Sequence, residues 1–180
     1  MKANKVIVAL SGSIRENSST QRTLNSLQKH ISTECEYIIY NGLHKLPHFN
    51  PDLDGETPPS DVQSFRSLLD QADGVVICTP EYIKGVPGVL KNALEWLVSS
   101  ATLYEKPVAV ITSSGGGEHA HQALQLNLSM LQAHVPNEWT LLISGANSKL
   151  NENGEYVREE VVESLQKLLD SLKGHITSNS

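Results

Sequence analysis

Hydroxyl side chains and one arginine are concentrated in residues 11–20, which read SGSIRENSST. The segment leaves an expected strand and opens an expected helix. Amides at a helix N-terminus carry partial positive charge and lack intrahelical acceptors, while hydroxyls and a guanidinium donate further hydrogen bonds. We therefore predict that this segment binds a phosphate group. The residues that would contact it are Ser11, Ser13, Arg15, Ser18, Ser19 and Thr20.

The alternative for the same segment is an ordinary Ser/Thr helix cap beside a surface arginine. A cap needs one hydroxyl, however, and five stand close to Arg15 here. The segment contains neither the GxGxxG fingerprint of dinucleotide-binding folds nor the GxxxxGK[ST] fingerprint of P-loop proteins. It therefore predicts a phosphate site of another kind.

Residues 79–88, TPEYIKGVPG, form a second segment of unusual composition. Pro87 stands where the first turn of a helix would begin, a position that proline favours. The preceding stretch is longer and richer in glycine than a minimal connection requires. Tyr82 offers a ring face to a flat heterocycle, and a packed loop tyrosine is an equally good interpretation.

Residues 112–118, TSSGGGE, form a third such segment. Three consecutive glycines let the backbone approach a ligand closely or adopt positive φ. A flexible turn is the alternative, but because the segment follows an expected buried strand we favour ligand contact. His119 and His121 follow it, and they either meet a phosphate or carboxylate of a substrate or lie solvated in a first helical turn.

The elements that must position these segments alternate along the chain. Short β-branched runs are typical of strands buried on both faces of a parallel sheet, and their alternation with helical segments predicts a doubly wound α/β sheet. In such sheets ligands bind beyond the carboxyl ends of the strands, where all three segments would meet. The expected strands are residues 6–10, 37–40, 74–78, 107–112 and 139–143, and the expected helices are residues 20–31, 62–70, 89–98, 118–131 and 156–172.

The 180 residues fit a single domain, which we place at residues 1–174, with residues 175–180 as a disordered tail. The longest irregular stretch, residues 41–60, contains four prolines. A stretch of this length is more often a functional or lid loop than a linker. Trp96 and Trp139 fall at the spacing of packed helix and strand positions.

Composition excludes several classes of function. The net charge of −6 and the lack of a basic run argue against a nucleic-acid surface. No apolar stretch approaches the ~20 residues needed to cross a bilayer, and no signal peptide is indicated. The chain has two cysteines, Cys35 and Cys78, both in strand-like segments. We expect them to be buried, reduced thiols of a cytoplasmic protein, without a metal site.

The first two segments carry a specific resemblance. Residues 12–18, GSIRENS, are similar to a GSxRxxS motif, and PEY at residues 80–82 is followed by PGVLKNA at residues 87–93. With the glycine segment in the same order, the chain resembles the NAD(P)H-dependent FMN reductase family over residues 6–134. That family also contains quinone, chromate and azo-dye reductases.

The resemblance implies a flavodoxin-like sheet of order 2-1-3-4-5 with helices on both faces, non-covalent FMN, and a homodimer or homotetramer. By position, the FMN phosphate would be held by Ser13, Arg15, Ser18 and Thr20. The residues implied around the ribityl chain and isoalloxazine are Pro80, Glu81, Tyr82, Ile83, Ser113, Ser114, Gly115 and Gly116. The family usually has a polar residue, often Asn, and then Gly-Ser where this chain has Ile83, Lys84 and Gly85.

On this resemblance we hypothesise an oxidoreductase with a ping-pong cycle. NADPH or NADH would reduce the bound FMN, leave, and be replaced by a flavin, quinone or similar small-molecule acceptor. Hydride transfer belongs to N5 of the flavin, so no side chain is expected to act as a catalytic acid or base. A flavodoxin-like electron carrier, whose acidic charge would suit a basic partner, and a flavin-free binding module are the alternatives.

Overall fold

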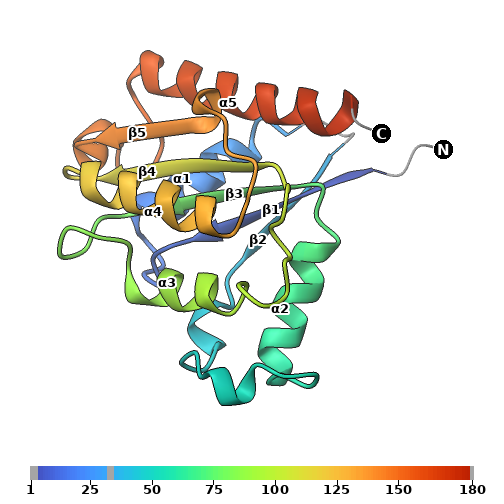
Figure 1. The fold of residues 1–180 in the computed structure, drawn as a ribbon. Coiled ribbons are helices and arrows are strands. Elements are labelled where there is room, and N and C mark those ends of the chain that lie inside the picture. The colour runs from blue at the N-terminus through green and yellow to red at the C-terminus, as the bar shows by residue number, and fades with distance from the viewer. Residues whose placement is uncertain (1–3, 32–34, 179–180) are drawn as a thin grey trace.

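A central parallel sheet organises the molecule in this computed structural model, which describes residues 4–31 and 35–178. Its strands are β1 (Lys5–Ser11), β2 (Cys35–Tyr40), β3 (Gly74–Thr79), β4 (Val108–Ser114) and β5 (Thr140–Ser144). The strands are parallel and lie in the order β2-β1-β3-β4-β5 (Figure 1). The predicted five-stranded sheet and its order are confirmed.

Helices cover both faces of this sheet. The core on one face is shared with α1 (Ser19–Gln28) and α5 (Glu159–Ser178), and the core on the other with α2 (Ser60–Asp70), α3 (Gly88–Glu95) and α4 (Glu118–Met130). In Figure 1, α5 lies above the sheet and α2 and α3 lie below it. Among the described helices, none is long and apolar enough to cross a membrane. The parallel sheet with helices on both faces confirms the predicted doubly wound α/β architecture.

Alternate residues of each inner strand supply the two cores. On β1, Val8 and Leu10 pack on the side of α2, α3 and α4, whereas Ile7 and Ala9 pack on the side of α1 and α5. All four side chains are fully buried. This double burial explains why the strands are nearly continuous apolar runs in the sequence.

The inner strands end side by side at one edge of the sheet. Ser11, the last residue of β1, pairs with Cys78 of β3, and Thr79 pairs with Thr112 of β4. The loops that follow these strands therefore begin at the same level. This register is what brings the three chemically unusual segments together.

Two element boundaries differ from the sequence prediction. Helix α5 continues to Ser178, so the predicted disordered tail is wrong for residues 175–178, while residues 179–180 lie outside the described residues. Ile176 is buried in the core shared with α1, and this contact favours the longer helix. Strand β4 includes Ser113 and Ser114, which the sequence analysis assigned to the glycine segment.

The predicted burial of four side chains is confirmed. Trp96 and Trp139 are both buried, as are the side chains of Cys35 and Cys78. Burial raises the pKa of the Cys78 thiol, which keeps the sulfur protonated. These residues serve packing.

Candidate active site

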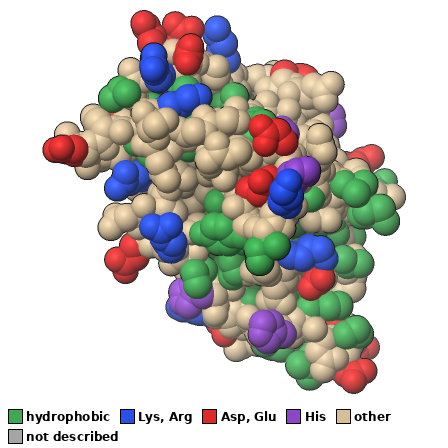
Figure 2. Space-filling view, turned by 90° about the vertical axis from the view of Figure 1, so that its left-hand side faces the viewer, with side chains coloured by type: hydrophobic (Ala, Val, Ile, Leu, Met, Phe, Trp, Pro, Cys, Tyr) green, Lys and Arg blue, Asp and Glu red, His purple; other side chains and the backbone are tan. Residues whose placement is uncertain are grey.

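Three loops leave the carboxyl edge of the sheet: residues 12–18 after β1, residues 80–87 after β3 and residues 115–117 after β4. Figure 2 shows this edge face on, with hydrophobic side chains near its middle and charged side chains around them. Each loop, with its flanking residues, is hydrogen-bonded to the other two. The contacts are Ser13 Oγ with the Tyr82 hydroxyl (3.4 Å), Ser19 Oγ to Ser113 O (2.9 Å) and Glu81 N to Ser114 Oγ (3.2 Å).

The phosphate loop, residues 11–20, ends in a capped helix. Ser18 is the N-cap of α1, and its Oγ accepts a hydrogen bond from Gln21 N at 3.1 Å. The N–H groups of Ser19 and Thr20 belong to the first helical turn and have no acceptor within the helix. Together with the partial positive charge of the helix end, these amides are chemically suited to an anion.

A chain of hydroxyls shapes the phosphate loop from the inside. The oxygens of Ser11 and Thr20 lie 3.1 Å apart, and those of Thr20 and Ser18 lie 2.9 Å apart. All three side chains are buried. Gly12 lets the loop pass close to β3, because a Cβ there would lie 2.8 Å from Thr79 Oγ1. Ser11 and Thr20 therefore fix the loop's shape and lie behind its exposed surface.

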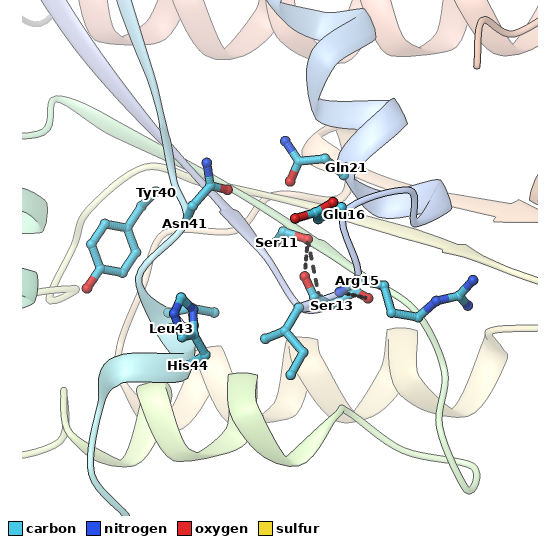
Figure 3. A pocket seen from close by; sticks show the side chains of 10 residues that line it. Ser11, Ser13, Arg15, Glu16, Gln21, Tyr40, Asn41, Leu43 and His44 are labelled. Carbon is cyan, nitrogen blue, oxygen red and sulfur yellow. Dashed lines mark hydrogen bonds between the residues drawn. The ribbon is translucent and has the colours of Figure 1, made fainter. Parts of the chain in front are cut away.

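Arg15 is the cation of the phosphate loop. Its side chain is exposed and extends away from Asn41 and His44 (Figure 3). Within the described part of the chain it makes no ion pair. Its backbone N–H donates to Ser13 Oγ at 3.3 Å, which fixes the base of the side chain. A guanidinium so placed is available to an anionic ligand.

The loop after β3 contains a tight hairpin. Tyr82 and Gly85 exchange backbone hydrogen bonds of 3.1 Å in both directions. Between them, Ile83 and Lys84 have φ of 49° and 54°, the geometry of a type I′ turn. A side chain in this left-handed region costs about 1–2 kcal/mol, which is why Asn-Gly is the usual pair. The turn leaves Tyr82 46% exposed and Ile83 fully exposed.

Glu81 joins this loop to helix α4. Its Oε2 accepts a hydrogen bond from Ala120 N at 3.0 Å, in the first turn of the helix. The N-cap residue Gly117 has no side chain to do this, and a carboxylate at a helix N-terminus is stabilising. Pro80 is buried next to it in the chain. The carboxylate of Glu81 thus positions the loop, and its backbone faces Ser114.

The glycine loop, residues 115–117, combines a crowded and an open position. Gly117 has φ of 120°, and a Cβ there would lie 2.8 Å from both Thr112 and Leu142. At Gly115, in contrast, no atom lies within 4 Å of the Cβ position. The loop therefore needs its third glycine for its own conformation, while the first leaves open space for a ligand.

Comparison with known proteins identifies the family. The family model described as NADPH-dependent FMN reductase matches residues 6–148. The chain belongs to the NADPH-dependent FMN reductase family. A quinone reductase of Escherichia coli is 32% identical over 96% of this chain and 92% of its own length, and an NADH:(hydroxy)cinnamate reductase subunit of Vibrio ruber is 30% identical over 89% and 82%.

A solved structure agrees with this assignment. FerB, a flavoenzyme NAD(P)H:(acceptor) oxidoreductase from Paracoccus denitrificans, has a TM-score of 0.81 and 26% identity, covering 97% of this chain and 98% of that chain. The resemblance, the flavodoxin-like fold, the oxidoreductase class and the pairing of FMN with a reduced nicotinamide nucleotide are thereby confirmed at the level of the family.

The side chain of Ser113 points into the protein. It is fully buried, and its Oγ lies 3.2 Å from both Thr23 Oγ1 and the Tyr156 hydroxyl. Thr23 Oγ1 and the Tyr156 hydroxyl are 2.7 Å apart, and burial raises the pKa of Tyr156. Ser113 therefore supports the site without exposing its hydroxyl. Thr23 and Tyr156 could not be found from the sequence, because these partners are 133 residues apart and no local motif links them.

The two histidines after the glycine loop have different surroundings. His121 Nδ1 lies 2.9 Å from Thr112 Oγ1, and burial lowers the pKa of this imidazole. His119 is exposed, and its Nε2 lies 3.5 Å from Lys84 Nζ of the hairpin. Substrate contact thus stays a prediction for His119 alone. Among the described residues, no three His, Cys, Asp or Glu side chains are grouped to bind a metal.

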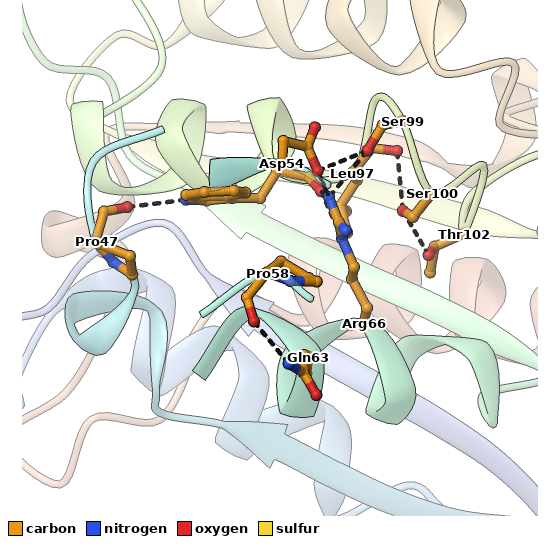
Figure 4. A network of polar contacts seen from close by, with 10 residues as sticks. Pro47, Asp54, Pro58, Gln63, Arg66, Leu97, Ser99, Ser100 and Thr102 are labelled. Carbon is orange, nitrogen blue, oxygen red and sulfur yellow. Dashed lines mark hydrogen bonds and ion pairs between the residues drawn. The ribbon is translucent and has the colours of Figure 1, made fainter. Parts of the chain in front are cut away.

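The long stretch between β2 and α2 is anchored to its neighbours (Figure 4). Arg66 forms an ion pair with Asp54 at 2.7 Å and donates to Trp96 O at 2.8 Å, and Trp96 Nε1 donates to Pro47 O at 2.8 Å. Burial opposes ionisation of Asp54, but hydrogen bonds from Arg66 and Ser99 prevail and hold its pKa below the ordinary value. These contacts anchor Pro47 and Asp54 of residues 41–60, for which a functional role stays a prediction.

Proposed function

We propose that the chain is an FMN-dependent oxidoreductase that transfers electrons from NADH or NADPH to quinones or similar small organic acceptors. One observation carries the proposal: a helix start suited to phosphate, a half-exposed tyrosine ring and an open glycine loop are hydrogen-bonded together at one edge of the sheet. Relatives named quinone reductase and NADPH azoreductase support the class of acceptor.

The residues of this edge fit FMN. The first-turn amides of Ser19 and Thr20 and the exposed guanidinium of Arg15 would hold the phosphate. The ring of Tyr82 and the open backbone at Gly115 would lie beside the isoalloxazine. The remaining residues predicted to contact FMN would line the rest of the site: Ser13, Ser18, Pro80, Ile83, Ser114 and Gly116. The inward-facing predicted residues would position them: Ser11, Glu81 and Ser113.

When bound, FMN supplies the redox chemistry, taking electrons from the nicotinamide nucleotide and giving them to the acceptor in a ping-pong cycle. The chain's own task is to bind the flavin and leave one face accessible to both substrates in turn. The 46% exposure of Tyr82 and the open space at Gly115 leave room for the isoalloxazine at this edge of the sheet. The fully exposed Ile83 offers an apolar contact to an aromatic acceptor.

The absorbance spectrum of the purified protein is the first test. Yellow absorbance that bleaches with NADH or NADPH and returns with a quinone supports the proposal. Protein that stays colourless after incubation with FMN contradicts it and favours a flavin-free binding module. Steady oxidation of NADH or NADPH with a soluble quinone by the isolated protein would exclude the electron-carrier alternative.

We also propose that two copies of the chain pair through α3, α4 and the residues after α3. Val98, Leu126 and Met130 are 65%, 65% and 78% exposed, and a cavity of about 190 Å³ between the helices is lined by Val98 and Met130 among others. Exposed apolar side chains gathered in this way mark interaction sites. Met130→Glu should shift the mass measured by light scattering toward the monomer. Leu53→Glu, at a 47% exposed residue elsewhere, is the control.

A cytoplasmic location is part of the same proposal. Cys35 and Cys78 are buried within strands, as expected of thiols in a reducing compartment. Cell fractionation that places the native protein outside the cytoplasm would contradict it.

A further inference from the structure

A cavity of about 390 Å³ lies on the β2 side of the phosphate loop. One wall is the phosphate loop itself with Gln21 of α1, and the opposite wall is the end of β2 and the turn after it, including Asn41, Leu43 and His44 (Figure 3). A volume of this size is within the range of small-molecule sites. The cavity shares Ser11, Ser13 and Arg15 with the proposed FMN site and extends from them toward β2.

The phosphate loop turns its FMN-binding groups away from the cavity. Arg15 extends away from Asn41 and His44 in Figure 3. The hydroxyl of Ser13 faces Tyr82, and that of Ser19 faces Ser113. The loop thus has two sides, one toward the loops after β3 and β4 and one toward β2. The cavity belongs to the second side.

Glu16, Gln21 and Asn41 bring hydrogen-bond acceptors to the polar part of the cavity. Figure 3 shows the polar ends of Glu16, Gln21 and Asn41 turned toward one another. Gln21 Nε2 donates to Asn25 Oδ1 at 3.1 Å, which leaves its carbonyl oxygen for a ligand. Within the described residues, the side chains of Glu16 and Asn41 have no hydrogen-bond partner. A carboxylate beside amide oxygens is suited to hydroxyl donors, as in the acidic residue that binds a ribose in dinucleotide folds.

The cavity is unsuited to a phosphate. Its single basic lining residue other than histidine is Arg15, which is directed out of it, and Glu16 would repel a second negative charge. The remaining walls offer Ile14, Leu43 and the ring of His44 to an uncharged, flat group. The acceptor groups of Glu16, Gln21 and Asn41 therefore favour a nucleoside with free hydroxyls over a phosphorylated one.

We infer that this cavity binds the adenosine end of the nicotinamide nucleotide through its free ribose hydroxyls, and that Glu16 thereby makes the enzyme prefer NADH to NADPH. The inference rests on the proposed function. The cavity opens on the β2 side of the phosphate loop, so a dinucleotide that filled both the cavity and the flavin site would have to cross this loop. A 2′-phosphate would meet the Glu16 carboxylate there.

Steady-state kinetics of the FMN-loaded protein with a soluble quinone test the inference. The Glu16 carboxylate would accept hydrogen bonds from the ribose hydroxyls of NADH and would repel the 2′-phosphate of NADPH. We therefore expect kcat/KM for NADH to exceed that for NADPH by about tenfold or more. In Glu16→Gln this ratio should fall at least about fivefold, through KM and not kcat. Asn41→Ala should raise KM for NADH, and Glu36→Gln, an exposed carboxylate on β2, should change neither value.

Binding of a nucleotide fragment gives a second readout that does not depend on turnover. Calorimetric titration of the FMN-loaded protein should show ADP-ribose binding about tenfold more tightly than its 2′-phosphorylated form, with the difference lost in Glu16→Gln. FMN affinity should not fall in this variant. Equal binding of the two fragments, or a kinetic ratio within twofold of wild type in Glu16→Gln, would overturn the inference. Protein without flavin or without turnover would instead contradict the proposed function.

Discussion

Tyr156→Phe tests whether the buried hydroxyls behind the site position its loops. The Tyr156 hydroxyl lies 2.7 Å from Thr23 Oγ1 and 3.2 Å from Ser113 Oγ. Thr23 belongs to α1 and also donates to Ser19 O at 2.7 Å, while Ser113 lies on β4 just before the glycine loop. One hydroxyl thus links the start of α1 to the end of β4.

The expected magnitude follows from these contacts. The substitution removes one oxygen and keeps the ring, so it leaves no large cavity. A buried hydrogen bond contributes a net ~0.5–1.5 kcal/mol, and this hydroxyl contacts two partners, so the free energy of unfolding should fall by about 1–2 kcal/mol. In a domain of this size, that lowers the melting temperature by roughly 2–4 °C per kcal/mol. FMN affinity should fall about three- to tenfold, because the first turn of α1 and the glycine loop lose their common support.

Urea unfolding of the FMN-free protein and fluorescence titration with FMN measure the two effects. Tyr37→Phe is a matched control, because its buried hydroxyl also bonds to α1, donating to Leu24 O at 3.4 Å, but does not reach the site. We expect Tyr37→Phe to leave FMN affinity unchanged. If Tyr156→Phe loses stability but binds FMN as well as the control, the network is structural only and the positioning role is refuted.

Three other substitutions test separate parts of the structure. Arg15→Ala should weaken FMN binding about ten- to a hundredfold and riboflavin binding hardly at all, because riboflavin lacks the phosphate; equal losses in fluorescence titration would contradict the assignment. Gly117→Ala should lower the free energy of unfolding by about 1–3 kcal/mol in urea, because its Cβ would lie 2.8 Å from Thr112 and φ is 120°. In the folded protein the pKa of Asp54 lies below the ordinary carboxyl value of about 3.9. The ionised carboxylate therefore stabilises the fold at pH values above about 3.9. This stabilisation is lost as the pH falls through the folded pKa. Asp54→Asn should therefore flatten the fall in unfolding free energy between roughly pH 5 and pH 2, and an unchanged slope would refute this account.

Much of the fold could be predicted because its signals are local. A strand covered on both faces must be apolar throughout, and the runs found in the sequence correspond to β1 through β5. The β4 boundary failed for a physical reason. Ser113 and Ser114 are polar, so the apolar run ended before them, yet Ser113 is fully buried because Thr23 and Tyr156 satisfy its hydroxyl.

Some parts of the candidate site could likewise be predicted from local sequence signals, and others could not. The phosphate loop could be predicted because its hydroxyls, its arginine and the helix start are adjacent in sequence. The hairpin at Ile83 and Lys84 could not, because type I′ turns are recognised by Asn-Gly and this turn is held instead by the paired backbone bonds of Tyr82 and Gly85. The cavity beside Glu16 could not either, since its second wall follows β2, more than twenty residues further along the chain.

The three loops of the active site form a closed triangle of hydrogen bonds, and this has a consequence for how substitutions combine. Ser13 contacts Tyr82, Glu81 contacts Ser114, and Ser19 contacts the backbone of Ser113. Removing one contact leaves the other two in place, so a single change such as Ser19→Ala should weaken FMN binding less than a paired change does. Removing two lets one loop move relative to the others. The effects of paired substitutions should therefore exceed the sum of the single ones, as coupled contacts in one network do, and the loops act as one binding unit.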